Sequence, residues 1–153
     1  MERMNKMRKY NVNKCELMAG KYLVKEDGFI SNGTWAIKED YVIVRKSINA
    51  ELVTVKEIAK LEKLLLNPVV KTLKDLLMLD RKTHPEKITP DFSKENCVLL
   101  PVNPDYSIGM SRGDFKRLMN IAPDIELYTD RVRWHQLQIV LNNEIIGVFM
   151  GTC

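Results

Sequence analysis

The spacing of apolar residues changes twice along this chain of 153 residues. Residues 21–46 hold short runs rich in β-branched and aromatic side chains, and residues 54–80 repeat apolar side chains at helical intervals. From residue 97 onward the strand-like runs return around one more short helical segment. This order of segments predicts an α+β fold with a mostly antiparallel sheet, because strands and helices occupy separate stretches of the chain.

Two turn signals divide the first β-rich segment. Asp27-Gly28 and Asn32-Gly33 each separate two short β-rich runs. An Asn-Gly pair favours a tight hairpin, because both central residues of such a turn need a positive φ. With a further run at 41–45, these signals predict an antiparallel meander of three or four short strands over residues 21–46.

The middle of the chain predicts a pair of helices. Thr54 and Glu57 match a capping box, in which each side chain bonds the backbone N–H of the other residue. Apolar residues then recur at helical spacing until Asn67-Pro68 interrupts the pattern, and a second apolar face follows. We expect two helices, or one helix sharply kinked at Asn67, over residues 54–80. Residues 81–96 contain two prolines and many polar groups, so we expect a surface loop there.

The C-terminal third predicts five strands around a short helix. Ser111 precedes the helical segment, and Asn142-Asn143 suits a tight turn between the last two strands. The strands are expected at 97–102, 106–110, 125–129, 132–141 and 144–150.

The length suits one domain with a core of its own, and is short for two. We predict a basic leader over residues 1–20, which need not be ordered, and a single α+β domain over residues 21–153.

The positive charge is concentrated near the N-terminus. Residues 1–25 carry seven basic and two acidic side chains, a formal charge of +5, whereas the whole chain carries +4. The remainder is therefore close to neutral, at −1. A basic segment of this kind can lie along phosphates or an acidic protein surface. The alternative is a solvated leader with no partner.

The three cysteines are far apart, odd in number and not arranged as Cys-x-x-Cys, which argues against a disulfide framework and a zinc knuckle. The first seven residues are charged and do not resemble a secretory signal. No apolar run approaches the roughly 20 residues that a membrane-spanning helix needs. We therefore expect a cytoplasmic protein without a membrane partner.

Sequence motifs for catalysis and for cofactor binding are missing. No glycine-rich pattern of the dinucleotide or P-loop type follows a strand and opens a helix. The two histidines, His84 and His135, have no partner at a metal-ligand spacing. Three acidic pairs are candidates for acid–base chemistry or Mg²⁺ binding: Glu26-Asp27, Glu39-Asp40, and Asp124 with Glu126. We expect the first two pairs to be turn residues between strands, and the third to be staggered at the start of a strand rather than convergent. We therefore expect no catalytic residue, no metal site and no cofactor.

The strongest candidate for a binding surface is the aromatic and basic sequence at residues 128–135. Arg131 and Arg133 flank one residue, so in a strand they project to the same side, with Tyr128 nearby. Such groups contact phosphates and stack bases, or anchor a protein partner. The alternative is a charged outer face of a sheet with one packed tryptophan. The predicted binding residues, with the basic residues of the leader, are Tyr128, Arg131, Arg133, Trp134, Arg3, Arg8 and Lys9. A further set could extend this surface if two sheets lie side by side: Lys38, Arg45 and Lys46.

Two stretches carry a resemblance. The segment Asn32-Gly33-Thr34-Trp35-Ala36-Ile37-Lys38 resembles small uncharacterised proteins of phages and mobile elements. The tail from Ser111-Arg112-Gly113-Asp114-Phe115-Lys116 to Ile146-Gly147-Val148-Phe149-Met150-Gly151 is similar in element order to the repeating unit of DNA sliding clamps. A phage origin implies a protein that inhibits host defence, as anti-CRISPR proteins do, or one that assists replication.

The expected function is that of a non-enzymatic binding protein encoded by a phage or a mobile element. It would associate with a nucleoprotein machine or inhibit a host factor. Its partner would be a protein or a nucleoprotein complex, and direct contact with nucleic acid is a further option. One alternative is a small enzyme whose site combines scattered Asp, Glu, Lys and Tyr residues. Another is a self-assembling subunit that pairs through an apolar edge strand at 145–150, which would make the chain a homo-oligomer.

Overall fold

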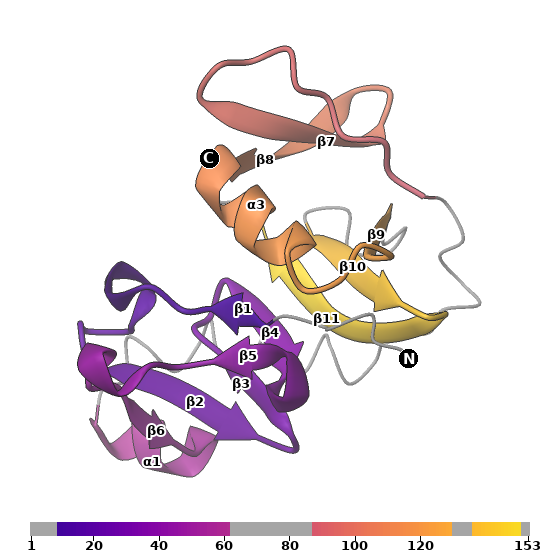
Figure 1. Cartoon of the computed structure of the whole chain (residues 1–153). Coiled ribbons are helices and arrows are strands. Elements are labelled where there is room, and N and C mark those ends of the chain that lie inside the picture. The colour runs from indigo at the N-terminus through magenta and orange to yellow at the C-terminus, as the bar shows by residue number, and fades with distance from the viewer. Residues whose placement is uncertain (1–8, 62–86, 130–135, 151–153) are drawn as a thin grey trace, which may run out of the picture. The chain divides into compact units, whose positions relative to one another are not determined.

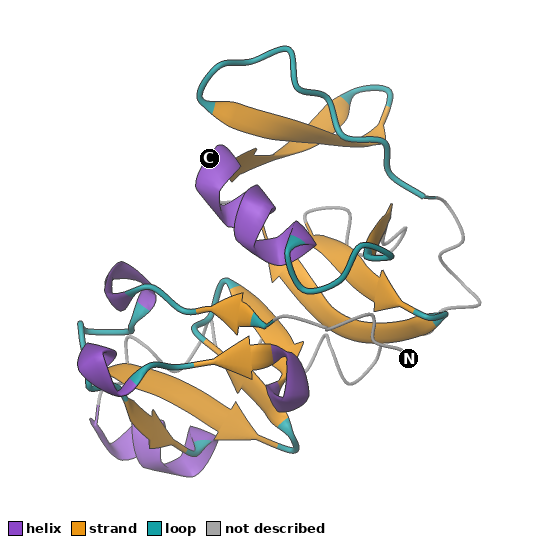
Figure 2. Cartoon of the chain, in the orientation of Figure 1, coloured by secondary structure: helices purple, strands orange, loops and turns teal. Residues whose placement is uncertain are grey.

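The computed structural model of the chain describes residues 9–61, 87–129 and 136–150. These residues form two compact units, an N-terminal unit that ends before residue 80 and a C-terminal unit that follows it. In both units strands outnumber helices, so the composition is that of an α+β or mostly-β fold (Figures 1 and 2). Within the described ranges, no helix is both long and apolar enough to span a membrane.

The N-terminal unit contains the predicted antiparallel meander. It consists of β2 (Tyr22–Glu26), β3 (Phe29–Ser31) and β4 (Trp35–Lys38), in that order across the sheet. A short strand, β6 (Glu51–Val53), pairs in parallel with β2 on the other side. The side chains of Leu23, Ile37 and Trp35 are almost completely buried and form the centre of this core.

The two predicted turns of the meander differ in structure. Asp27 and Gly28 have φ angles of 50° and 82°, so they form the tight two-residue turn that the sequence predicts. Around Asn32-Gly33 only the glycine has a positive φ, of 92°. The Oδ1 atom of Asn32 instead accepts the backbone N–H groups of Thr34 and Trp35, at 2.9 and 3.1 Å. The hairpin predicted at this site is confirmed, because β3 and β4 pair antiparallel across it. The expected pair of positive φ angles is absent there, because the asparagine side chain closes the loop.

The fourth predicted strand of the meander pairs elsewhere. A short 3₁₀ helix, η2 (Glu39–Tyr41), follows β4 and leads into β5 (Val42–Ile43). β5 pairs in parallel with β1 (Tyr10–Asn11), which lies about thirty residues earlier in the sequence. A second 3₁₀ helix, η3 (Lys46–Ile48), connects β5 to β6.

Residues 9–20, which the sequence analysis assigned to the basic leader, pack into the N-terminal unit. The side chain of Tyr10 is fully buried in an edge-to-face contact with Trp35, with ring centroids 5.1 Å apart. The 3₁₀ helix η1 (Lys14–Glu16) follows β1. The Oε2 atom of Glu16 accepts the Tyr10 hydroxyl at 2.8 Å and the Trp35 indole N–H at 3.0 Å. Its Oε1 atom accepts the backbone N–H of Asn13 at 2.8 Å, so one carboxylate fixes this segment.

The predicted capping box is confirmed at the start of α1 (Val55–Leu61). The Thr54 N–H donates to Glu57 at 2.9 Å, and the Glu57 N–H donates to the Thr54 hydroxyl at 3.1 Å. Glu26, at the end of β2, accepts the Val55 N–H at 2.9 Å and ties the helix to the sheet. Ile58 is fully buried. The rest of the predicted helix pair, residues 62–80, lies outside the described residues.

The C-terminal unit begins with an irregular segment and a β-hairpin. Residues 87–96, the described part of the predicted loop, form only isolated β-bridges. The antiparallel pair β7 (Cys97–Asn103) and β8 (Tyr106–Ser111) follows. The helix α3 (Arg112–Met119) starts directly after β8, and the Ser111 hydroxyl caps it by accepting the Asp114 N–H at 3.1 Å. The predicted strands and the short helix at this position are confirmed.

Three further antiparallel strands complete the C-terminal unit. They are β9 (Glu126–Thr129), β10 (Gln136–Leu141) and β11 (Glu144–Met150), with β10 in the middle. Asn142 and Asn143 form the predicted tight turn, with φ angles of 51° and 67°. The five β10 residues from Leu137 to Leu141 are all buried, so both faces of this strand lie in the interior.

Gln138 is the exception among these buried strand residues. It lies opposite Tyr128 of β9 and Val148 of β11, and its side chain is fully buried. Among the described residues, neither the oxygen nor the nitrogen of its amide has a hydrogen-bond partner. A buried polar group without a partner loses its hydration and gains nothing in return, so Gln138 destabilises the unit.

We predict that Glu16→Ala lowers the free energy of unfolding by about 2–4 kcal/mol, because hydrogen bonds to a charged acceptor contribute about 1.5–3 kcal/mol each. Chemical denaturation monitored by tryptophan fluorescence would measure the change. The matched control is Glu51→Ala, which removes only the exposed ion pair with Lys21 (3.0 Å) and should cause no measurable loss. Equal stability of the two variants would contradict the central role of Glu16.

We predict that Gln138→Met raises the free energy of unfolding by about 1 kcal/mol or more, because it replaces an unpartnered amide with an apolar group of similar size. Leu137→Met, at the neighbouring buried position, is the control and should be neutral or slightly destabilising. A loss of stability in Gln138→Met would show that the amide is satisfied in solution. Thermal unfolding followed by circular dichroism would measure both variants.

Candidate anion-binding site

Of the seven predicted binding residues, the structure describes Tyr128 and Lys9. The remaining five fall outside the described residues: Arg3, Arg8, Arg131, Arg133 and Trp134. Lys9 is exposed and directly precedes β1. Tyr128 is half-buried on β9, and its hydroxyl donates to the carboxylate of Glu126 at 3.4 Å. These two residues belong to different units, so each is considered with its own surroundings.

The parallel pairing of β1 with β5 brings two basic segments together. Tyr10 lies opposite Val42 and Asn11 opposite Ile43, and the backbone N–H of Val12 continues the pairing by donating to the Ile43 carbonyl at 3.2 Å. Both strands run in the same direction, so the residues that follow them emerge side by side. The chain after β1 carries Lys14, and the chain after β5 carries Arg45 and Lys46.

These two segments enclose a hollow of about 260 Å³. Its lining contains two cationic side chains, two asparagines and one serine, and no carboxylate. The lining residues are Asn11, Val12, Asn13, Lys14, Arg45, Ser47 and Ile48. A second hollow of about 340 Å³ shares Arg45 and adds Lys46, Asn49 and the exposed Leu52.

The cations that line the hollows, and Lys9 before β1, form no ion pair within the described part of the chain. Lys9, Lys14, Arg45 and Lys46, which we call the basic surface, are all exposed, and none of them forms an ion pair with a described carboxylate. Elsewhere in the same unit lysines are paired, as in Lys25–Glu39 at 2.9 Å. The basic surface therefore carries an uncompensated positive charge.

The oxygens of the nearby Glu16 carboxylate accept the Tyr10, Trp35 and Asn13 donors described above. Arg45 offers a planar fork of N–H donors, and Lys14 offers a mobile ammonium group. Asparagine amides and a serine hydroxyl are further donors of the kind that proteins direct at phosphate oxygens. The arrangement therefore suits an anion, and a phosphate group in particular.

Sequence analysis found only part of this site. It placed Lys9 among the binding residues and proposed Arg45 and Lys46 as an extension of a surface centred on residues 128–135. Lys14 was assigned to the leader, and Asn13 and Ser47 were not considered. The signal that unites them is the pairing of β1 with β5, and two strands of two residues each leave almost no periodic pattern in a sequence.

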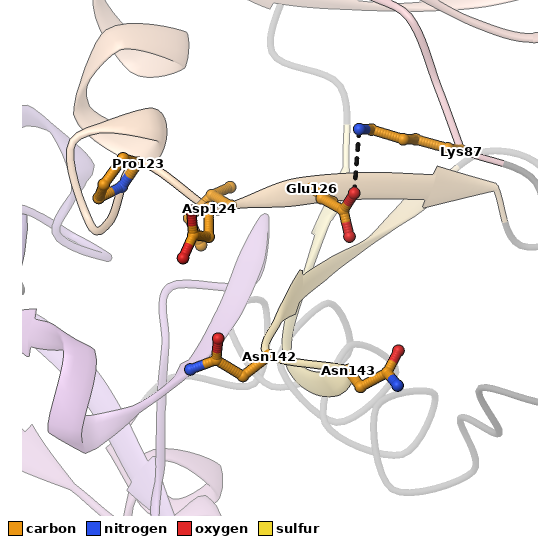
Figure 3. A pocket seen from close by; sticks show the side chains of 7 residues that line it. Lys87, Pro123, Asp124, Glu126, Asn142 and Asn143 are labelled. Carbon is orange, nitrogen blue, oxygen red and sulfur yellow. Dashed lines mark ion pairs between the residues drawn. The ribbon is translucent and has the colours of Figure 1, made fainter.

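A larger hollow, of about 470 Å³, lies in the C-terminal unit and has a different chemistry (Figure 3). Asp124, Glu126, Asn142 and Asn143 line it with Lys87. The ammonium of Lys87 lies 2.9 Å from the Glu126 carboxylate, and this hydrogen bond and the opposite charge raise the pKa of Lys87. A lysine nucleophile or base acts in its neutral form, so a raised pKa works against that role.

The two carboxylates of this hollow also do not converge. Figure 3 shows the Glu126 carboxylate close to Lys87 and the Asp124 side chain apart from it, in line with the predicted stagger. Among the described residues, no group of three or more His, Cys, Asp or Glu side chains is arranged to hold a metal ion. The basic surface is accordingly the stronger candidate site.

We predict that pyrophosphate stabilises the protein through the basic surface. At ten times its dissociation constant, a ligand of the native state adds about 1.4 kcal/mol to the unfolding free energy. The double variant Lys14→Ala/Arg45→Ala should lose this gain. The control is Lys56→Ala/Lys60→Ala, which removes two exposed lysines from α1 in the same unit and should keep it. Thermal unfolding with increasing pyrophosphate would measure the effect, and equal shifts in all three proteins would exclude the site.

Comparison of the sequence with protein-family models and with curated proteins, and of the structure with solved structures, gave no match. The functional inference therefore comes from the side chains of this chain.

Proposed function

We propose that the chain is a non-enzymatic binding protein that contacts the phosphate backbone of nucleic acid through its basic surface. The observation that carries this proposal is the pair of exposed, unpaired cations Lys14 and Arg45, which line a hollow together with asparagine and serine side chains. Lys46 lines the adjoining hollow, and Lys9 directly precedes β1. Contacts of these residue types to phosphate fix a protein on nucleic acid without reading its sequence. Binding of this kind suits a protein that joins a larger nucleoprotein complex.

The sequence before Lys9 supports the same proposal. Arg3, Lys6 and Arg8 precede Lys9 in the sequence and add three basic residues to this part of the chain. Each cation that neutralises a phosphate releases a counterion, which is favourable at low salt. The C-terminal unit, whose larger hollow is lined by carboxylates and amides, offers a less suitable surface for phosphate.

The proposed biological setting is a phage or mobile element, as the resemblance of residues 32–38 implies. A protein that covers nucleic acid without catalysis can inhibit a host nucleoprotein by occlusion, or can serve as an accessory to replication. The clamp-like order of α3, β9, β10 and β11 would agree with a role on DNA.

The test is fluorescence anisotropy with labelled duplex DNA, single-stranded DNA and RNA over a range of salt concentrations. With four phosphates neutralised on duplex DNA, the logarithm of the association constant should fall with the logarithm of salt with a slope of about −3 to −4. Lys14→Glu/Arg45→Glu should weaken binding at least tenfold and flatten this slope.

Lys56→Glu/Lys60→Glu is the matched control, because it makes the same change in net charge on α1 of the same unit. It should retain most of the affinity and the slope of the unmodified protein. An equal loss in both double variants would mean that only net charge matters, and would contradict the proposed site. Absence of binding to all three nucleic acids at low salt would contradict the proposed function.

A further inference from the structure

The loop between residues 90 and 97 of the C-terminal unit is fixed at two points. Asp91 exchanges two backbone hydrogen bonds with Leu99 of β7, at 2.8 and 3.0 Å. At the other end, the guanidinium of Arg112 donates from Nε to the Glu95 carbonyl at 2.8 Å and from Nη2 to the carbonyls of Phe92, at 2.9 Å, and Lys94. The loop therefore has a defined conformation although it contains no regular secondary structure.

This fixed loop holds an aromatic side chain in solvent. Phe92 is 52% exposed, the largest exposure among the described large apolar residues. Its ring makes an edge contact with Phe115 of α3, with centroids 5.5 Å apart, and the Arg112 guanidinium lies 5.9 Å from its centre. A flexible loop could turn such a ring inward, whereas this loop is held with the ring outward. Aromatic and arginine side chains in a fixed arrangement are typical of the residues that dominate binding at protein interfaces.

One nitrogen of Arg112 is left for a partner. Its Nε and Nη2 atoms make the three backbone contacts, and Nη1 has no hydrogen-bond partner within the described residues. The guanidinium forms no ion pair with a described carboxylate either, because Asp114, the acidic residue of α3, is bonded to Arg117. A carboxylate from another molecule would complete the hydrogen bonding of Arg112 beside the exposed ring.

The charges around Phe92 favour an acidic partner. Lys116 is exposed and forms no ion pair with a described carboxylate. Lys94 is exposed as well, and the hydrogen bonds from Ser93 together with the charge of Lys94 lower the pKa of the Asp91 carboxyl group. With Arg112 they give three cations, against the carboxylates of Asp91 and Glu95. The Asp91 carboxylate accepts the Ser93 N–H at 2.9 Å, so it is directed at its own loop. Glu95 is the one exposed acidic residue of this surface.

We propose that Phe92, Phe115 and Arg112 form a docking surface for an acidic segment of a protein partner. An apolar side chain of that segment packs on Phe92, and an adjacent carboxylate binds Nη1 of Arg112. A nucleic-acid base stacked on Phe92 is the alternative occupant, and the titration below separates the two. The proposal involves different residues and a different unit from the basic surface, and so does not depend on it.

The test is a two-dimensional NMR titration of the full-length, ¹⁵N-labelled protein with three synthetic nonapeptides. The first has one leucine between aspartate and glutamate residues, the second has lysine in place of every acidic residue, and the third has serine in place of leucine. A single-stranded oligothymidine is titrated in parallel. We expect the first peptide to shift the amide signals of residues 92–95 and 112–116, and the other three ligands to bind there at least tenfold more weakly.

Two variants of Phe92 and two controls complete the test. Phe92→Ala should weaken binding of the first peptide about tenfold or more. Phe92→Glu should also weaken binding, because it places a carboxylate where the acidic peptide would dock. Both variants keep the backbone carbonyl of residue 92, which accepts the hydrogen bond from Arg112, so the loop is preserved. Tyr106→Ala removes another exposed aromatic ring from β8, and Lys14→Glu/Arg45→Glu alters only the other unit. Both controls should bind like the unmodified protein.

Several outcomes would overturn the proposal. Equal binding of the acidic and basic peptides would show that charge does not select the partner. Tighter binding of the oligothymidine at the same signals would assign the surface to nucleic acid, and shifts that depend on protein concentration alone would assign it to a second copy of the chain. Unchanged affinity in both Phe92 variants, or no binding of the first peptide, would remove the docking surface.

Discussion

The carboxylate of Glu16 is the interaction on which the N-terminal unit depends. It accepts hydrogen bonds from a buried tyrosine and a buried tryptophan and also from the backbone N–H of Asn13, so it joins η1, β1 and β4. Lys14 lies next to Asn13, and its place beside Arg45 follows from the path that this hydrogen bond gives the chain.

The C-terminal unit fixes its exposed surface in a comparable way, with the charges reversed. There a single guanidinium, that of Arg112, binds three backbone carbonyls of one loop, whereas Glu16 gathers three donors from separate elements. In both units one charged side chain makes hydrogen bonds inside the protein and determines which neighbouring groups face solvent. We relate both proposed contacts, with phosphate and with an acidic protein segment, to this arrangement.

The features that could be predicted from the sequence are those made by residues close together in the chain. The turn at Asp27-Gly28, the capping box of Thr54 and Glu57 and the cap at Ser111 each involve residues within four positions, so their chemistry is visible in the sequence. The pairing of β1 with β5 joins residues about thirty positions apart. The hydrogen bond from Arg112 to the Phe92 carbonyl joins residues about twenty positions apart. No local pattern encodes such contacts. The meander and the C-terminal strands could therefore be predicted, whereas the sequence indicates only Lys9, Arg45 and Lys46 of the basic surface and nothing of the surface around Phe92.

The parallel pair of β1 and β5 also has a consequence for the order of folding. The hairpin at Asp27-Gly28 closes between neighbouring residues, whereas β1 can reach β5 only after a loop of about thirty residues has closed, at a greater loss of chain entropy. Contacts of long sequence separation form late in folding. We therefore expect the hollow between Lys14 and Arg45 to be among the last parts of this unit to assemble. Phosphate binding would then report that the N-terminal unit has completed its folding, because an incomplete intermediate carries the same cations without bringing them together.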